Sequence, residues 1–406
     1  MRVALIDVNC KHSSTGKIVY DLYTELNKNG HEAAIYYGRG PKIKEKNIFK
    51  FGLDLETYFH ALMTRITGFT GVFSPISTYR LIRKLKKFKP DIVHIHELHA
   101  YFINLKPIMN YLKKAPLKVI WTFHCEFMFT GKCAITYDCN KWQSECSKCP
   151  QVKEYPKSLV FDFSNPMFRR KRKLFQDFNN LTIVTPSNWL ENKVKLSFLR
   201  NKRTLVINNG VDQKIFKKSD FSELEHNLSI NNKTVFLSVA ADILSDNKGG
   251  LRIIEIAKKL DPNKYVFVLI GALPSVEEVN LENVIFVKKI DNQKTLARYY
   301  SLASAYITLS KSENYPSTCL EALSCGTPII GYDVGGIKET TKKGFGFFVP
   351  YGDEEALIKL INGNNFNDIK KSNRIDQIYT PLHSKERMSQ DYLNLYDSNY
   401  MERNRI

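Results

Sequence analysis

Two glutamates stand on either side of a junction between an apolar run and a helical stretch. Glu313 lies in the loop, and Glu321 lies inside a helix that begins near Ser317. Pro316 is favourable at the start of a helix, and the first turn offers N–H groups that the helix does not use itself. With the helix dipole, these groups form a site for a diphosphate. The amides that we expect to bind it are those of Ser317, Thr318 and Cys319.

The two carboxylates would have different roles at such a site. Glu321 can accept hydrogen bonds from two adjacent ribose hydroxyls, whereas Glu313 lies towards whatever the diphosphate carries. For an isolated pair, the alternative is a solvated loop acid and a solvated helix acid. Cys319 and Cys325 on the same helix are interpreted as small packing residues.

Lys248 follows another apolar run. It lies in Asp246–Gly249, after a predicted strand at 234–239, and therefore at the carboxyl edge of a sheet. Its ammonium would neutralise a departing diphosphate, the effect that is largest when the leaving group is a dianion. The alternative for an isolated lysine is a surface residue before a helix.

Two residues of the N-terminal half are also candidates. His124 ends a predicted strand, 118–123, and Gly16 follows the first strand. Because Gly16 has no side chain, it would let backbone N–H groups approach the phosphates of a donor substrate, or an acceptor substrate. A simple turn explains the glycine nearly as well. An isolated histidine is more often structural than functional. The less specific histidines at 94, 96 and 99 are given no role.

A cysteine cluster occupies an insertion after the strand at 118–123. Cys146 and Cys149 have the spacing that brings two thiolates onto one zinc ion, and Cys133 with Cys139 would complete a tetrahedral site. Free thiols and disulfides are the alternatives, and a reducing compartment argues against disulfides. Such a metal would stabilise a polar loop and take no part in catalysis.

Apolar runs of strand length alternate with amphipathic helical stretches along the chain. The pattern extends from Val3 to Thr185, restarts after Asn209 and continues to Gly331. Near-continuous hydrophobic strands separated by helices indicate parallel sheets covered on both faces. We therefore predict an α/β protein with two doubly wound, Rossmann-like domains that bind ligands at the carboxyl ends of their strands.

We place the first domain at residues 1–196, with the cysteine-rich insertion at 125–150, and the second at 197–381. Residues 382–406 are predicted to contain a helix that packs back on the first domain, since Met388, Tyr392 and Leu395 share a face. The Asn-rich segment 362–373 is predicted to be a loop.

Several motifs together resemble those of the family-4 retaining glycosyltransferases. The strongest is the E-x7-E signature from Glu313 to Glu321, followed by Gly326-Thr-Pro328. The other similar segments, in the order that is typical of the family, are Lys89–His94 (K-P-D-x-V-H), Thr185–Trp189 (P-S-x-W), Asn209–Asp212 (N-G-V-D) and Asp333–Glu339 (G-G-x-x-E). Two further stretches, Ser13–Val19 and Trp121–His124, resemble the subgroup of bacterial exopolysaccharide assembly, such as the colanic-acid glycosyltransferases.

The resemblance implies a GT-B fold, with the nucleotide-sugar donor in the second domain, the acceptor in the first and a cleft between the two sheets. His124 would contact the donor sugar and support the transition state, and Glu313 would hold donor-sugar hydroxyls. The base would contact backbone atoms around Ile290. The family usually adds an arginine upstream of Lys248, but none occurs between Ser238 and Lys248.

The implied activity is metal-independent hexosyl transfer with retention, from a nucleotide-diphosphate sugar to a saccharide or polyprenyl-diphosphate-linked acceptor in surface polysaccharide biosynthesis. We expect no catalytic cofactor. A nucleotide-sugar epimerase and a donor-binding pseudoenzyme scaffold are the alternatives. The missing arginine favours the scaffold slightly, whereas Lys248, His124 and the glutamate pair argue against it.

The formal net charge of +19 indicates an anionic partner. Tyr79–Lys89 is predicted to be a basic amphipathic helix, and Phe168–Leu174 adds a second basic run. Both suit docking on an anionic inner leaflet, although the apolar stripe of the first helix can instead face the sheet. Nucleic acid is not expected, since no recognition module accompanies the charge. With no signal peptide and no apolar run near the roughly 20 residues of a membrane span, a cytoplasmic, peripheral protein is predicted.

Overall fold

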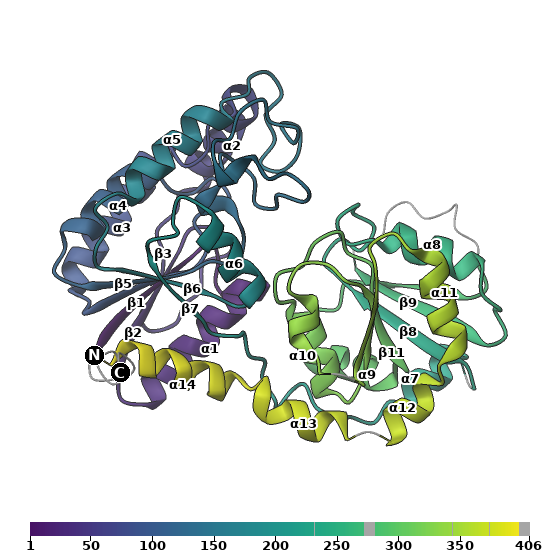
Figure 1. The fold of residues 1–406 in the computed structure, drawn as a ribbon. Coiled ribbons are helices and arrows are strands. Elements are labelled where there is room, and N and C mark those ends of the chain that lie inside the picture. The colour runs from purple at the N-terminus through teal and green to yellow at the C-terminus, as the bar shows by residue number, and fades with distance from the viewer. Residues whose placement is uncertain (231, 272–280, 343, 373, 398–406) are drawn as a thin grey trace. The chain divides into compact units, whose positions relative to one another are not determined.

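The chain folds into two compact units, which we describe separately. The computed structural model describes residues 1–230, 232–271, 281–342, 344–372 and 374–397 (Figure 1). The first unit comprises residues 1–208 together with the segment from Met388, and the second comprises Asn209–Arg387. Each unit contains one parallel β-sheet covered by helices on both faces, which confirms the predicted fold class.

The first unit contains a seven-stranded sheet in the order β3-β2-β1-β4-β5-β6-β7. Every neighbouring pair is parallel, so all the carboxyl ends lie at one edge. The strands are β1 (Arg2–Asp7), β2 (Glu32–Tyr37), β3 (Ile48–Lys50), β4 (Ile92–Ile95), β5 (Lys118–Thr122), β6 (Leu181–Thr185) and β7 (Arg203–Val206). Strand residues are buried on both faces, which explains their continuous hydrophobicity.

Two helical layers enclose this sheet. One face packs against α3 (Pro75–Phe88), α4 (Leu105–Lys114), α5 (Ser164–Phe175) and α6 (Asn188–Leu196). The other face packs against α1 (Ser14–Lys28) and the C-terminal helix α14 (Lys385–Tyr396). The helix α2 (Asp54–Thr67) lies beside the start of α3, where the Glu56 carboxylate accepts hydrogen bonds from the Ile76 and Ser77 amides, both at 2.8 Å.

The predicted return of the C-terminal helix is confirmed. Met388, Tyr392, Leu395 and Tyr396 are buried in the same apolar cluster as Val3, Leu5 and Ile120. Two tyrosine hydroxyls tie the helix to strand residues: Tyr396 to His94 Nδ1 at 2.7 Å and Tyr392 to Thr122 Oγ1 at 2.9 Å. The final turns of the described chain therefore complete the core of the first unit.

The second unit contains a six-stranded sheet in the order β10-β9-β8-β11-β12-β13. Its neighbouring strands are again parallel. The strands are β8 (Thr234–Val239), β9 (Tyr265–Gly271), β10 (Val284–Lys288), β11 (Ala305–Thr308), β12 (Ile329–Tyr332) and β13 (Gly346–Val349). The helices are α7 (Ser222–Asn227), α8 (Gly250–Lys258), α9 (Gln293–Leu302), α10 (Ser317–Ser324), α11 (Glu354–Gly363), α12 (Phe366–Ser372) and α13 (Ile375–Leu382).

Two features differ from the sequence-based expectations. The contact boundary falls after Asn208 rather than after residue 196, because β7 adds a seventh strand to the first sheet, and the second unit runs to Arg387 rather than to 381. The segment 362–373 includes the helix α12 instead of being a loop, since the fully buried Phe366 packs on Phe236 and Phe347. For α3, the second of the two alternatives holds, since its apolar residues Leu81 and Leu85 face the sheet.

Candidate functional site

Lys248 and Glu313 form an ion pair at the carboxyl edge of the second sheet. Lys248 follows β8, Glu313 follows β11, and Lys248 Nζ lies 2.7 Å from Glu313 Oε1. The same oxygen accepts a hydrogen bond from Ser310 Oγ at 2.9 Å. The Glu313 carboxylate raises the pKa of Lys248, so this ammonium stays charged at neutral pH. The two residues that the sequence singled out separately therefore meet.

Glycines allow the neighbouring loops to approach these two residues. A Cβ on Gly249, whose φ is +76°, would lie 2.1 Å from the Leu309 carbonyl oxygen. A Cβ on Gly335, at φ +62°, would lie 1.8 Å from the Glu313 carbonyl oxygen, which also accepts the Gly336 N–H at 2.9 Å. No other residue fits either position without moving backbone. The two glycines thus fix where Lys248 and Glu313 stand.

The helix α10 begins at Ser317, directly after the loop that carries Glu313. Pro316 is its N-cap residue, and the Cys319 N–H donates to the Pro316 carbonyl at 3.1 Å. The Cys319 side chain is fully buried in the core. The prediction that Cys319 offers an unused amide is therefore wrong, because the first turn is tight. The amides of Ser317 and Thr318 precede the regular backbone hydrogen bonds of the helix. Both residues are partly exposed.

Glu321 is held in place by a buried tyrosine that the sequence analysis missed. Its carboxylate is buried, and Tyr300 of α9 donates to Oε2 at 2.8 Å. Burial, followed by the Glu321 charge, raises the pKa of Tyr300 well above its usual value, so the hydroxyl remains a donor. The available signal was the Tyr-Tyr pair at residues 299 and 300, but nothing in its spacing relates it to Glu321.

No arginine joins Lys248 in the described loop between β8 and α8. Two other basic side chains, Arg252 and Lys311, both form ion pairs with Asp246. The Arg252 guanidinium nitrogen lies 2.9 Å from Asp246 Oδ1. Ile290 follows β10 at the same edge of the sheet and is partly buried against the α9 and α10 core. Its contact with a base remains a prediction.

The carboxyl edge of the first sheet contains a stack of histidines. His124, which follows β5, and His96, which follows β4, lie with their rings 14° apart, and His124 Nε2 is 3.0 Å from His96 Nδ1. Burial lowers the pKa values of both rings, so both are neutral at pH 7. His124 is the more exposed of the two. Sequence analysis identified His124 but gave its partner no role.

Gly16 does not lie in a loop as predicted. It is in the first turn of α1, and its N–H donates to the N-cap residue, Ser13, at 3.0 Å. That amide is therefore engaged within the helix cap and does not present itself to a phosphate. A Cβ at this position would lie 2.3 Å from Asn9 Oδ1 and 3.1 Å from the Lys11 backbone nitrogen, so a larger residue would have to displace the Asn9 side chain.

Further titratable groups surround this histidine pair. Burial raises the pKa of Asp7 to about 7, and its carboxylate accepts the Glu97 N–H at 3.1 Å. Glu97 Oε2 lies 3.0 Å from His99 Nε2 and accepts a hydrogen bond from Cys125 Sγ at 3.4 Å. Within the described residues, Glu97, His99 and Cys125 are the group whose metal-type ligand atoms lie within 4.8 Å of one another. Sequence reasoning missed Asp7 and Glu97, since their clustering depends on adjacent strand ends.

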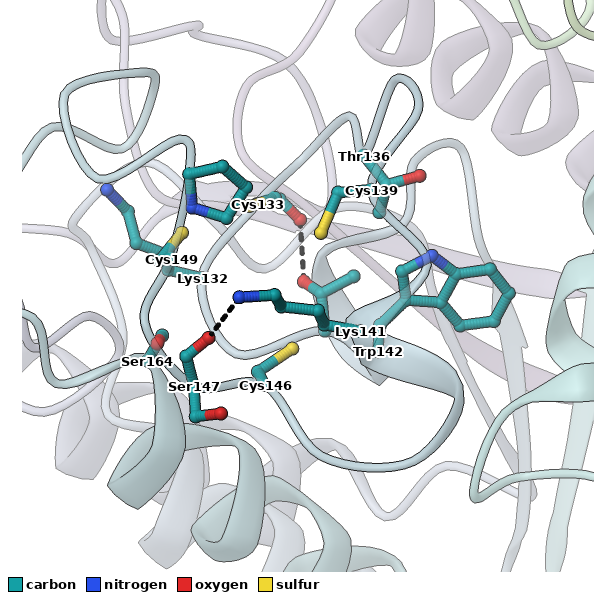
Figure 2. Close-up of a pocket in the computed structure, with 12 residues that line it drawn as sticks. Lys132, Cys133, Thr136, Cys139, Lys141, Trp142, Cys146, Ser147, Cys149 and Ser164 are labelled. Atoms are coloured by element: carbon teal, nitrogen blue, oxygen red, sulfur yellow. Dashed lines mark hydrogen bonds between the residues drawn. The ribbon is translucent and has the colours of Figure 1, made fainter.

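The four predicted zinc ligands lie around one pocket of the first unit. Its lining includes the cysteines at 133, 139, 146 and 149, with Lys132, Lys141 and Trp142 (Figure 2). The structure therefore places the four predicted cysteines around one pocket. Neither residue of the histidine pair, His96 or His124, lines this pocket.

Two family models match the chain in tandem. The model described as Glycosyltransferase Family 4 matches residues 15–214, and the model described as Glycosyl transferases group 1 matches residues 220–377. The chain belongs to the family-4 glycosyltransferases. The residues matched correspond closely to the two structural units, and the second model spans Lys248, Glu313 and Glu321.

Comparison with individual proteins supports this assignment to the family. The glycosyltransferase is 24% identical, over 98% of its length and 100% of the relative's, to WcaC of Escherichia coli (strain K12), which is provisionally assigned to colanic acid biosynthesis. Sucrose-phosphate synthase from Thermosynechococcus elongatus has the same fold, with a TM-score of 0.69, 15% identity and 98% coverage of each chain. Anabaena HepE in complex with UDP-glucose gives a TM-score of 0.66 at 16% identity, covering 97% of this chain and 99% of its own. The fold is accordingly of the GT-B type.

None of the described helices combines the length and the low charge of a membrane-crossing segment.

Proposed function

We propose that this glycosyltransferase transfers a hexosyl group, with retention, from a nucleotide-diphosphate sugar to a saccharide or polyprenyl-diphosphate-linked acceptor in surface polysaccharide biosynthesis. The observation that carries the proposal is the convergence of Lys248, Glu313 and the start of α10 at one sheet edge. The similarity to WcaC and to HepE, which was solved with UDP-glucose, supports the pathway and the donor class.

The second unit supplies the groups that a nucleotide diphosphate requires. The Lys248 ammonium and the amides of Ser317 and Thr318 would bind the diphosphate, since both favour negative charge. The Glu321 carboxylate, oriented by Tyr300, would accept hydrogen bonds from the ribose hydroxyls. The backbone around Ile290 would contact the base.

Glu313 and His124 would act on the transferred sugar. Glu313 would hold sugar hydroxyls, and its contact with Lys248 sets the ammonium in place before the donor arrives. His124, neutral at pH 7, would donate or accept one hydrogen bond to the sugar while His96 fixes its ring. The first unit would supply the acceptor site.

Retention is proposed to follow a front-side route. The acceptor oxygen forms a bond to the anomeric carbon on the face from which the diphosphate leaves, and the bond from that carbon to phosphate oxygen breaks. The acceptor proton passes to the departing phosphate oxygen. Lys248 stabilises the developing charge electrostatically, the role that a metal ion plays in other transferases, so we propose metal-independent catalysis.

Membrane docking is proposed to involve α2 rather than the stripe of α3, which is buried. Five apolar side chains on α2 are exposed: Leu55, Tyr58, Phe59, Leu62 and Ile66. Leu159, Val160 and Phe161 extend this surface, since the Leu159 N–H donates to the Arg65 carbonyl at 2.8 Å. Exposed Arg65 and Lys157 add positive charge. An apolar surface with basic groups suits an anionic leaflet that presents a lipid-linked acceptor.

The catalytic proposal is tested by incubating the purified chain with uridine, guanosine and adenosine diphosphate sugars and lipid-linked saccharide acceptors. We expect one donor class to yield a product whose anomeric configuration, determined by NMR, matches that of the donor. A product of inverted configuration would overturn the retaining mechanism. Release of a 2-epimer of the donor sugar without transfer would support the epimerase alternative.

The membrane proposal is tested by flotation with vesicles of phosphatidylglycerol and of phosphatidylcholine. We expect binding to the anionic vesicles that is lost in Leu55→Ser/Phe59→Ser. The control is Leu251→Ser, an exposed leucine of α8 in the second unit, with 56% exposure against 85% for Leu55 and 54% for Phe59. Equal loss in the control, or no binding by the parent chain, would contradict docking through α2.

A further inference from the structure

The insertion between β5 and α5 contains little regular structure. Within residues 123–163 the structure has two short 3₁₀ turns, Phe127–Phe129 and Lys141–Gln143. Four cysteines from different parts of this insertion line a single pocket, and Figure 2 shows them on loops that surround it. A loop region of this length must be stabilised by interactions other than the backbone hydrogen bonds of helices and strands.

Backbone amides are directed at two of the four sulfur atoms. The Gly131 N–H donates to Cys146 Sγ at 3.2 Å, and the Gln151 N–H donates to Cys149 Sγ. Cys133 Sγ and Cys149 Sγ also share a hydrogen bond, although the chain places them sixteen positions apart. Amide donors favour a sulfur that carries negative charge, because hydrogen bonds to an ionised acceptor are the stronger ones.

Two lysines beside this pocket are buried without a carboxylate partner. Lys132 and Lys171 are only 2% and 3% exposed. The Lys132 ammonium donates to backbone carbonyls at residues 151, 152 and 154, and that of Lys171 donates to those of Phe127 and Thr130. In the described part of the chain, neither has an acidic oxygen within 4.0 Å. Burial disfavours the charged form of both lysines, so a negative charge beside them would stabilise their ammonium groups.

We propose that Cys133, Cys139, Cys146 and Cys149 bind one structural zinc ion as thiolates. Four thiolates and one divalent cation carry a net charge of −2, which would stabilise the ammonium groups of the two buried lysines beside the pocket. Two disulfides would be neutral and would supply no further counter-charge to either lysine. The ligand set is all sulfur, which is typical of closed, structural zinc sites.

Zinc binding would draw the four sulfur atoms together. No three of them are grouped as tightly as the ligand atoms of Glu97, His99 and Cys125, the group within 4.8 Å among described residues. The thiols would release their protons as the metal binds, and the loops would close around it. We do not place the ion at Glu97, because its carboxylate already accepts hydrogen bonds beside the histidine pair.

Zinc content of the full-length chain, purified without an affinity metal, tests the proposal. We expect one zinc per chain by elemental analysis, and its release by a mercurial reagent with four thiols titrated per ion. Cobalt substitution should give the charge-transfer and ligand-field absorption of tetrahedral tetrathiolate cobalt. These measurements use the parent chain, so they do not depend on whether a variant folds.

The variants locate the site. Serine at each of the four cysteines should lower the zinc content at least tenfold or prevent soluble expression, whereas Cys125→Ser and Cys325→Ser should retain one zinc per chain. A chain with less than a tenth of an equivalent of zinc, or with four fewer free thiols than its sequence contains after denaturation, would overturn the proposal. So would a cobalt spectrum without thiolate charge transfer.

Discussion

The carboxyl edges of the two sheets hold chemically different groups. The second edge carries a pre-formed ion pair, Lys248 and Glu313, and a carboxylate, Glu321, oriented by a tyrosine hydroxyl. The first edge carries neutral, stacked histidines, His96 and His124, beside the pair formed by Glu97 and His99. In the proposed function, the second edge binds the charged leaving group, and His124 of the first edge contacts the uncharged sugar.

The largest effect on activity should come from a substitution at the second edge, which carries the ion pair of Lys248 and Glu313. Lys248→Ala should lower kcat by about 10²–10³-fold, because loss of one pre-organised electrostatic contact to a developing charge has that magnitude. The measurement is steady-state transfer with the preferred donor. Lys258→Ala is the matched control, since Lys258 also pairs with a glutamate, Glu255 at 2.7 Å, on an exposed face of α8. Similar rates for Lys248→Ala and the control would contradict the proposed role.

A substitution in the histidine pair of the first edge should have a smaller effect on activity. His124→Ala should lower kcat/KM by about 5–150-fold, because a sugar hydroxyl left without its partner costs about 1–3 kcal/mol. Because burial holds the pKa of His124 below 6.5, activity should be insensitive to this group above that pH and should fall as the pH drops through its pKa. A pH profile of kcat/KM for the parent chain and for His124→Gln checks this. An acidic limb unchanged in the variant would exclude His124 as its cause.

The glycine next to Glu313 links backbone geometry to the charged edge. Gly335→Ala should destabilise the second unit by about 1–3 kcal/mol through its left-handed backbone alone, with a further cost from the clash with the Glu313 carbonyl. Denaturant unfolding measures the loss. Gly363→Ala in α11 is the control, because a Cβ there meets nothing within 4 Å. Equal stability of both variants would show that the loop is not constrained as described.

Tyr300 is a positioning residue, so its removal should affect donor binding more than the chemical step. Tyr300→Phe should raise KM for the donor about tenfold while changing kcat little, since the Glu321 carboxylate would lose its orienting donor. The split between the two constants is the measurement. A loss confined to kcat would instead place Tyr300 in the transition-state contacts.

The last effect is on stability and not on activity, and it concerns the pH dependence of the first edge. Burial lowers the pKa of His94 to about 3, and its ring contacts His96, Tyr392, Tyr396 and Thr122. The unfolded state therefore binds one more proton between about pH 3 and 6.5, so stability is lost as the pH falls through this window. His94→Asn should reduce the slope of unfolding free energy by up to about 1.4 kcal/mol per pH unit there. The exposed His226→Asn serves as the control.

The difference between the edges also explains what the sequence could predict. Glu313, Glu321 and the start of α10 lie in one continuous segment whose local rules, a proline before a helix and a buried strand, are visible in sequence. Lys248 was found because parallel strands share one carboxyl edge. At the first edge, Asp7, His96, Glu97 and His124 come from three strand ends, and their contacts depend on strand order, which no local pattern encodes.

Two kinds of error have local causes. The Gly16 amide was misplaced because helix starts cannot be fixed to a residue without the Ser13 cap geometry, and Cys319 because the first turn of α10 is tighter than a regular helix. The domain boundary shifted because the short β7 is only partly buried and gives a weak hydrophobic signal. The spacing of the four cysteines singled them out in the sequence, and they line one pocket, whereas their binding of zinc stays a prediction.

Donor binding by the charged edge is the central claim, and a thermal-shift screen against uridine, guanosine and adenosine diphosphate sugars tests it most directly. A ligand that binds only the folded chain adds about 2.7 kcal/mol of stability at a hundredfold excess over its Kd. We predict a rise in melting temperature with one nucleotide class, lost in Lys248→Ala and Glu321→Ala and kept in Lys258→Ala. No shift with any donor at millimolar concentration would contradict the account and favour a scaffold without a donor site.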